Sequence, residues 1–109
     1  MTRQALAPLA VAVTACLSPA VHAADPVAGR AKAQVCVNCH GVDGIGRMAN
    51  VPHIAGESEV YLVAQLEAFR AGKRTHEIMS VIARDLSDAD IADLAAWYAR
   101  IEITATVPE

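Results

Sequence analysis

Residues 36–40 read Cys-Val-Asn-Cys-His, CVNCH, and this stretch decides how the rest of the chain is interpreted. A Cys-x-x-Cys pair is typical of three kinds of site: a redox-active disulfide, half of a zinc site, or, when His follows directly, a covalent attachment point for haem. The chain has three cysteines in 109 residues, and Cys36 and Cys39 are two of them. The surrounding sequence therefore has to separate these alternatives.

The first 23 residues have the features of an export signal. Arg3 and the terminal amine make a weakly positive start, an apolar run covers residues 6–17, and a Val-x-Ala sequence ends at Ala23. Pro8 and Pro19 interrupt the apolar region, which is also too short to span a bilayer. We predict cleavage after Ala23, so that residues 1–23 are a signal peptide and residues 24–109 form one domain.

A second interpretation of the leader uses Cys16, because residues 13–16 resemble the site at which bacterial lipoproteins are cleaved and lipid-modified. Cleavage after Ala23 instead removes Cys16, leaves 86 residues, and changes the formal net charge from −3 to −4 by the loss of Arg3. This mild acidity argues against binding to nucleic acid or to an anionic membrane surface. A chain of this size has difficulty building a core without a disulfide, a metal or a cofactor.

The pattern of apolar residues predicts an all-α fold with three main helices and a short one. Asp25, Ser58 and Ser87 are suited to be N-caps, and Gly72 is suited to end the second main helix. No segment alternates like a strand. The expected elements are a helix from Pro26 into the CVNCH motif, a Gly-rich loop over 41–57, a helix over 58–72, a short helix over 77–84 and a helix over 87–101.

Export and helical content together favour covalent haem attachment over the other two sites. Disulfide-exchange motifs normally start a helix in an α/β domain, and no strand is predicted here. A zinc site would need two further ligands, for which the exported chain offers only His53 and His76. In a haem site, Cys36 and Cys39 form thioethers to the two vinyl groups, and His40 binds the iron as the proximal ligand.

With these features the sequence resembles the class I c-type cytochromes of bacteria. The resemblance is strongest to a single domain of the di-haem cytochromes c-four and to their single-haem relatives. The resemblance covers nearly all of residues 24–109 and implies the small cytochrome c fold, wrapped around one covalently bound haem c with its iron. It rests on Gly29, CVNCHG at 36–41, Asp43-Gly44, PHIAG at 52–56, YLVAQL at 61–66, FRAGKR at 69–74, Met79 and Leu86-Ser87-Asp88.

The resemblance also implies roles for single residues. Met79 matches the distal iron ligand, on the face of the haem opposite His40. Pro52 matches a proline whose carbonyl accepts the N–H of the other ring nitrogen of His40 and so orients the imidazole. Gly29 matches a small residue at which the first helix crosses the last. Three other side chains remain alternatives for the distal position: His76, His53 and Met48.

The function that the resemblance implies is a periplasmic one-electron carrier between redox partner proteins, and not an enzyme. Two occupied axial positions leave no coordination site for a substrate, and the domain is too small to hold a substrate pocket beside a haem. Small, transient contacts with a donor and an acceptor are expected, with the protein a monomer or a weak dimer. Two alternatives remain: a haem c subunit or lipid-anchored module of a larger oxidoreductase, and a five-coordinate haem sensor or peroxidase in which Met79 does not bind iron.

Overall fold

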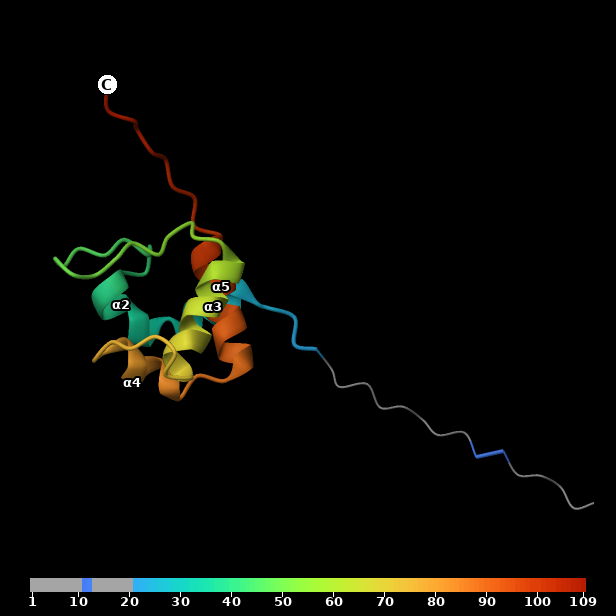
Figure 1. Cartoon of the computed structure of the whole chain (residues 1–109). Coiled ribbons are helices and arrows are strands. Elements are labelled where there is room, and N and C mark those ends of the chain that lie inside the picture. The colour runs from blue at the N-terminus through green and yellow to red at the C-terminus, as the bar shows by residue number, and fades with distance from the viewer. Residues whose placement is uncertain (1–10, 13–20) are drawn as a thin grey trace, which may run out of the picture.

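The computed structural model of the protein describes residues 11–12 and 21–109, so Cys16 and most of the predicted leader lie outside it. The described chain is helical and contains no strand, which confirms the predicted all-α class (Figure 1). None of the described helices has both the length and the apolar character needed to cross a membrane. In chain order they are α1 (Pro26–Lys32), α2 (Gln34–His40), α3 (Glu59–Arg70), α4 (Met79–Arg84) and α5 (Asp88–Ala99).

The first predicted helix is divided in two at Ala33, so the expectation of one continuous helix into the motif was wrong. Ala33 has ψ −2°, whereas an α-helix has about −42°. Its carbonyl accepts the N–H of Cys36 at 2.8 Å, a bond to the third residue ahead that tightens the turn. Alanine favours helix, so no local signal marks this break. The break lies in the core, where Ala33 is completely buried.

The remaining helix boundaries follow the predicted caps, with small differences at the ends of α4 and α5. The side chains of Asp25 and Ser58 accept backbone N–H groups in the first turns of α1 and α3. Ser87 and Asp90 form a reciprocal capping box at the start of α5, each accepting the other's backbone N–H at 3.0 Å. After α3, Gly72 has φ +73° and reverses the chain in a Schellman motif.

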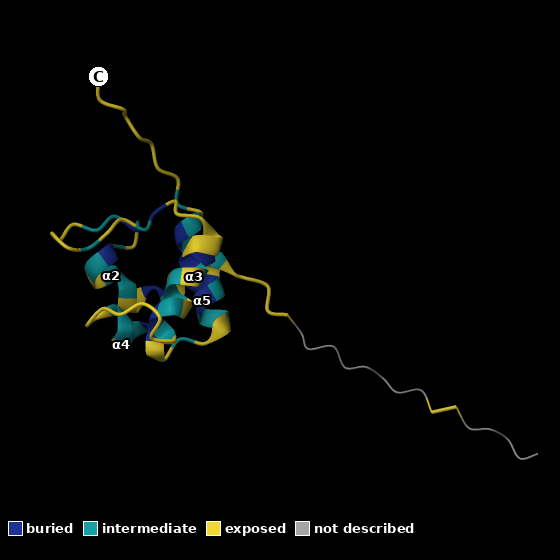
Figure 2. Cartoon of the chain, viewed as in Figure 1, coloured by how far each residue is buried: buried dark blue, intermediate teal, exposed yellow. Residues whose placement is uncertain are grey.

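Helix α5 lies at the centre of the fold, where it packs against α1 and α3, and α4 packs against α3. Figure 2 shows the buried residues gathered along α5 and the surfaces that face it. Its Ile91 and Leu94 are the largest apolar side chains with almost no exposure. The central cluster consists of Ala33, Leu62, Leu94, Ala95 and Tyr98.

Helix α1 crosses α5 at Gly29, the small residue expected at this position. A β-carbon built on Gly29 would lie 1.9 Å from the backbone oxygen of Asp93 and 3.0 Å from the β-carbon of Trp97. The first contact is impossible without moving α5, because a carbonyl oxygen cannot rotate away as a flexible side chain can. The glycine is therefore required for space, since its own φ is not positive.

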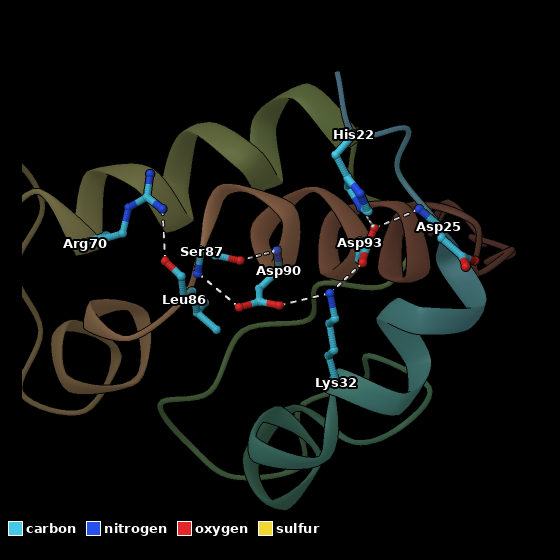
Figure 3. A network of polar contacts seen from close by, with 8 residues as sticks. All are labelled: His22, Asp25, Lys32, Arg70, Leu86, Ser87, Asp90 and Asp93. Carbon is cyan, nitrogen blue, oxygen red and sulfur yellow. Dashed lines mark hydrogen bonds and ion pairs between the residues drawn. The ribbon is translucent and has the colours of Figure 1, made fainter. Parts of the chain in front are cut away.

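The same crossing contains a buried carboxylate, Asp93 of α5, which is only 1% exposed. It accepts hydrogen bonds from the backbone N–H of Asp25 at 2.8 Å and from the Lys32 ammonium at 2.6 Å, and His22 Nε2 lies 2.8 Å away (Figure 3). Lys32 also pairs with Asp90 at 2.9 Å. The hydrogen bonds from Lys32 and from the Asp25 N–H hold the pKa of Asp93 well below its usual range.

We expect Gly29→Ala to lower the free energy of unfolding by about 3 kcal/mol or more, because the new methyl group meets the Asp93 carbonyl. The better helix propensity of alanine, about 1 kcal/mol, is too small to offset this clash. Urea unfolding followed by circular dichroism measures the difference. Val27→Ala, at a side chain of α1 that is 77% exposed, is the control and should change stability by less than about 0.5 kcal/mol. Equal stability of the two variants would contradict the close crossing.

We expect Asp93→Asn to lower the free energy of unfolding by about 1–3 kcal/mol at neutral pH, because two donors lose a buried charged acceptor. An acid with a lowered pKa stabilises the fold above its unfolded pKa of about 3.9, and this contribution is lost as the pH falls toward the folded value. The difference between variant and wild type should therefore shrink below about pH 4.

Asp88→Asn, in the first turn of the same helix, is the matched control because the Asp88 side chain is 87% exposed. Its effect should stay below about 1 kcal/mol. A constant difference between the Asp93→Asn variant and wild type from neutral to acid pH would show that the charge of Asp93 does not contribute.

Candidate functional site

A cavity of about 510 Å³ lies between α2, the loop over 41–57, α3 and the segment that leads into α4. Its size falls in the range of about 300–1,000 Å³ that is usual for cofactor and ligand sites. A second hollow, on the outer face of α3, is lined by Val60, Val63 and Ala64 between two glutamates and offers no Cys, His or Met. Apolar side chains in the wall of the first cavity include Val35, Ile54, Leu62, Leu66, Phe69 and Ile82.

The five residues predicted for the site all line this cavity: Cys36, Cys39, His40, Pro52 and Met79. The two cysteines and His40 come from α2, Pro52 comes from the following loop, and Met79 is the first residue of α4. These positions are separated by up to 43 residues along the chain. The fold therefore brings the whole predicted set together.

His40 is the last residue of α2 and is buried, with 9% of its surface exposed. Its Nδ1 lies 3.0 Å from the carbonyl oxygen of Pro52, which is the contact expected from the sequence. A carbonyl can only accept a hydrogen bond, so Nδ1 must carry a proton, and in the neutral ring Nε2 is then the nitrogen with a free lone pair. This contact holds the imidazole in the tautomer that a metal ligand requires.

The loop that carries Pro52 is held to the fold at both ends. The carbonyl of Gly44 accepts the N–H groups of Ile54 and Ala55 at 2.8 and 3.1 Å, which closes the loop on itself. At its start, the Tyr98 hydroxyl of α5 donates to the carbonyl of Gly41 at 3.2 Å. At its far end, the N–H of Gly56 donates to the Tyr98 carbonyl at 2.9 Å. One residue of α5 thus fixes the loop relative to α2.

The two thiols of the motif are free and partly buried. Burial, with a smaller effect from the neighbouring Cys39, raises the pKa of the Cys36 thiol to about 11. Disulfide-exchange sites need the opposite, a thiolate stabilised near neutral pH. Within residues 11–12 and 21–109, no three side chains among His, Cys, Asp and Glu are grouped to hold a metal ion. The geometry therefore offers no support for the disulfide or zinc interpretations.

The alternatives for the distal position are placed differently from one another. Met48 is 54% exposed and does not contribute to the cavity wall, whereas Met79 does. His53 and His76 also reach the wall, although both are exposed. Nδ1 of His76 accepts the backbone N–H groups of Ile78 and Met79, so this nitrogen is already occupied.

Arg74 is a residue of the site that sequence reasoning missed. The sequence suggests that this cation complements the C-terminal end of α3 and could belong to a local basic patch, but not that it lines a cavity. In the structure the chain reversal at Gly72 turns Arg74 back, so that its guanidinium lies 4.5 Å from the centre of the Phe69 ring and donates to Gln65 Oε1 at 2.6 Å. All three side chains line the cavity. The Schellman glycine is the one sequence signal that could have indicated this reversal.

These residues fit a covalently bound haem. Two free thiols lie three positions apart on one helix, next to an imidazole whose Nε2 is free to bind iron. A thioether enters the same cavity from another helix, and the wall is mainly apolar, as a porphyrin requires.

Two curated proteins illustrate the similarity of this chain to known sequences. Cytochrome c4 of Pseudomonas aeruginosa is 46% identical over 84 residues, which cover 76% of this chain and 42% of that protein. Cytochrome c-554(548) of Halomonas halodenitrificans is 42% identical over 83 residues, which cover 73% of this chain and 100% of that protein. The chain thus spans less than half of the first relative and the full length of the second.

A solved structure and a family profile agree with these relatives. The crystal structure of reduced recombinant cytochrome c4 from Pseudomonas stutzeri matches with a TM-score of 0.69 and 37% identity, over 73% of this chain and 47% of that chain. The profile described as cytochrome c matches residues 27–100, which include the motif, the loop, Met79 and all of α5. The chain therefore belongs to the cytochrome c family, and its cofactor is a covalently bound haem c with its iron.

Proposed function

We propose that this protein is a one-electron carrier in which Cys36 and Cys39 would hold haem c through thioethers, and His40 and Met79 would be the ligands of its iron. The observation that carries the proposal is the meeting of these four side chains at one cavity, with the imidazole of His40 oriented by the Pro52 carbonyl. When bound, the haem supplies one-electron chemistry by cycling between ferric and ferrous iron.

The residues of the chain would fix the ligands and exclude water before any electron moves. Pro52 would accept the Nδ1–H of His40, which would keep the Nε2 lone pair available and fix the orientation of the ring. Met79 presents a weak thioether ligand, which favours ferrous iron compared with a second imidazole and so raises the reduction potential. Apolar residues such as Leu66 and Phe69 keep the surroundings of the iron at low dielectric constant.

A carrier is preferred to an enzyme because two protein ligands leave no open position on the iron. The presence of Met79 in the cavity wall supports this choice over a five-coordinate sensor or peroxidase. A haem c subunit of a larger oxidoreductase would use the same site, and differs only in how the domain is held by its partner. The Halomonas relative, matched over its full length, shows that a protein of single-domain size exists among the relatives, which is compatible with a separate carrier.

We propose that the protein is located in the periplasm, after export and cleavage of the signal peptide after Ala23. Lipid attachment at Cys16 remains the alternative for this leader. Cleavage after Ala23 would remove His22 and its contact with Asp93. The contacts of Asp93 with Asp25 and Lys32 would remain, so α1 would stay attached to α5 in the exported chain.

The partners that we propose are a donor and an acceptor protein that meet this chain transiently, as a monomer or a weak dimer. The formal net charge of −4 over residues 24–109 favours steering toward a basic partner surface. Arg74, in the wall of the cavity, supplies local charge of the opposite sign. Both features would act mainly on association rates, which fall as salt screens the charges.

Mass spectrometry of the protein from a periplasmic fraction tests export and attachment together. We expect the mass of residues 24–109 plus one haem and no lipid. A retained leader would contradict cleavage after Ala23, and the added mass of lipid would favour the lipoprotein alternative at Cys16. A chain without covalent haem would sink the proposed function.

Cysteine variants test which thiols hold the haem. The double variant Cys36→Ser, Cys39→Ser is expected to lose all haem that survives a denaturing gel, because serine forms no thioether with the vinyl groups. Cys16→Ser is the matched control and should keep the wild-type haem content, since Cys16 lies in the leader. Equal loss in the control and the double variant would show a defect in export instead of attachment.

Methionine variants test the distal ligand. Met79→Ala is expected to remove the weak band at the red end of the visible spectrum that sulfur ligation gives ferric haem, and to lower the reduction potential. Met48→Ala, at an exposed methionine outside the cavity wall, should leave both unchanged. If Met79→Ala kept the band, another residue would have to be the ligand.

A further inference from the structure

Helix α4 begins at Met79, and its N-cap residue Ile78 gives it no side-chain cap. The first amide groups of any helix lack partners within the helix and need acceptors from elsewhere. Here His76 provides them. Its Nδ1 accepts the N–H of Ile78 at 3.2 Å and that of Met79 at 3.3 Å, and its carbonyl accepts the N–H of Ser80 at 3.0 Å.

The contact is reciprocal, because the Ser80 hydroxyl accepts the N–H of His76 at 3.0 Å. His76 and the first turn of α4 therefore form a closed set of hydrogen bonds around the backbone of Met79. The segment before this turn, residues 71–78, is exposed throughout. Burial of the preceding segment therefore does little to fix the position of Met79. The hydrogen bonds of His76 contribute more.

We propose that His76 is a positioning residue that caps α4 and so holds Met79 at the cavity. This inference rests on the proposed function, in which Met79 is the distal ligand. An Nδ1 that accepts amide protons is unprotonated, and its lone pair is not available to iron. Without this cap, the amides of Ile78 and Met79 lose their acceptor, the first turn frays, and the thioether of Met79 leaves ferric iron more readily.

The test measures how easily an external ligand replaces Met79 in the ferric, haem-loaded protein. Imidazole is titrated into wild type, His76→Ala, His76→Asn and Thr75→Ala. We expect imidazole to bind His76→Ala about 2- to 30-fold more tightly than wild type, which corresponds to the loss of one helix cap. The reduction potential of this variant should also be lower than that of wild type. The thioether would leave ferric iron more readily than ferrous iron, and its loss favours the ferric state.

Two variants separate the capping role from a general effect of mutation. His76→Asn should restore the imidazole affinity to within about twofold of wild type, because asparagine is a good cap acceptor. Thr75 is an exposed neighbour outside the cavity wall and makes no side-chain hydrogen bond within the described part of the chain. Thr75→Ala should therefore behave like wild type.

The outcomes distinguish this inference from the proposed function. One result is that the spectrum of the wild-type protein shows sulfur ligation while His76→Ala binds imidazole with unchanged affinity. That result would overturn the role of His76 and leave the proposed function intact. Equal effects of His76→Ala and His76→Asn would overturn it as well, since a cap acceptor would then be irrelevant. A wild-type spectrum without sulfur ligation would overturn both proposals.

Hydrogen exchange on the wild-type protein tests the same contact if His76→Ala does not fold. The amides of Ile78 and Met79 should be protected relative to the amide of Thr75 in the same exposed segment. Exchange of all three amides at one rate would overturn the proposed cap.

Discussion

The close crossing of α1 over α5 is the constraint on which the other parts of the fold depend. At this point Gly29 brings the α1 backbone against the carbonyl of Asp93, and the Asp93 side chain accepts donors from Asp25 and Lys32 on either side of the crossing. A glycine and a buried carboxylate thus fix both the separation and the register of the two helices. The turn at Ala33 then sends α2, with the CVNCH motif, away from α5 at a defined place.

The two sides of the cavity that carry His40 and Met79 are held in place by different kinds of contact. On the side of His40, Tyr98 of α5 bonds to the loop over 41–57 at both of its ends, and the loop in turn presents the Pro52 carbonyl. On the side of Met79, the short helix α4 packs on α3, and its first turn is held by His76. The imidazole is therefore set by the central helix, whereas the thioether is set by local hydrogen bonds.

The features that could be predicted from the sequence are those with a local cause or a strict spacing. The capping box at Ser87 is local, and the grouping of the motif, Pro52 and Met79 at one cavity followed from a family pattern. The turn at Ala33 could not be predicted, because alanine favours helix and residues 30–35 contain no Gly or Pro that would indicate a break. The position of Arg74 in the cavity wall could not be predicted either, since it depends on contacts with Phe69 and Gln65, which lie more than one helix turn before it.

The distribution of burial explains why this small domain needs its cofactor. Among the described residues, the buried apolar core contains several alanines and a few large side chains, of which Ile91 and Leu94 are the least exposed. Further large apolar side chains, Leu62, Leu66 and Phe69 among them, line the cavity of about 510 Å³. Each buried CH₂ group contributes about 0.8 kcal/mol, so these side chains stabilise the fold fully only when the cavity is filled by an apolar group. We therefore expect haem binding and folding to be coupled, and the proposed thioethers from Cys36 and Cys39 in α2 would make that gain permanent.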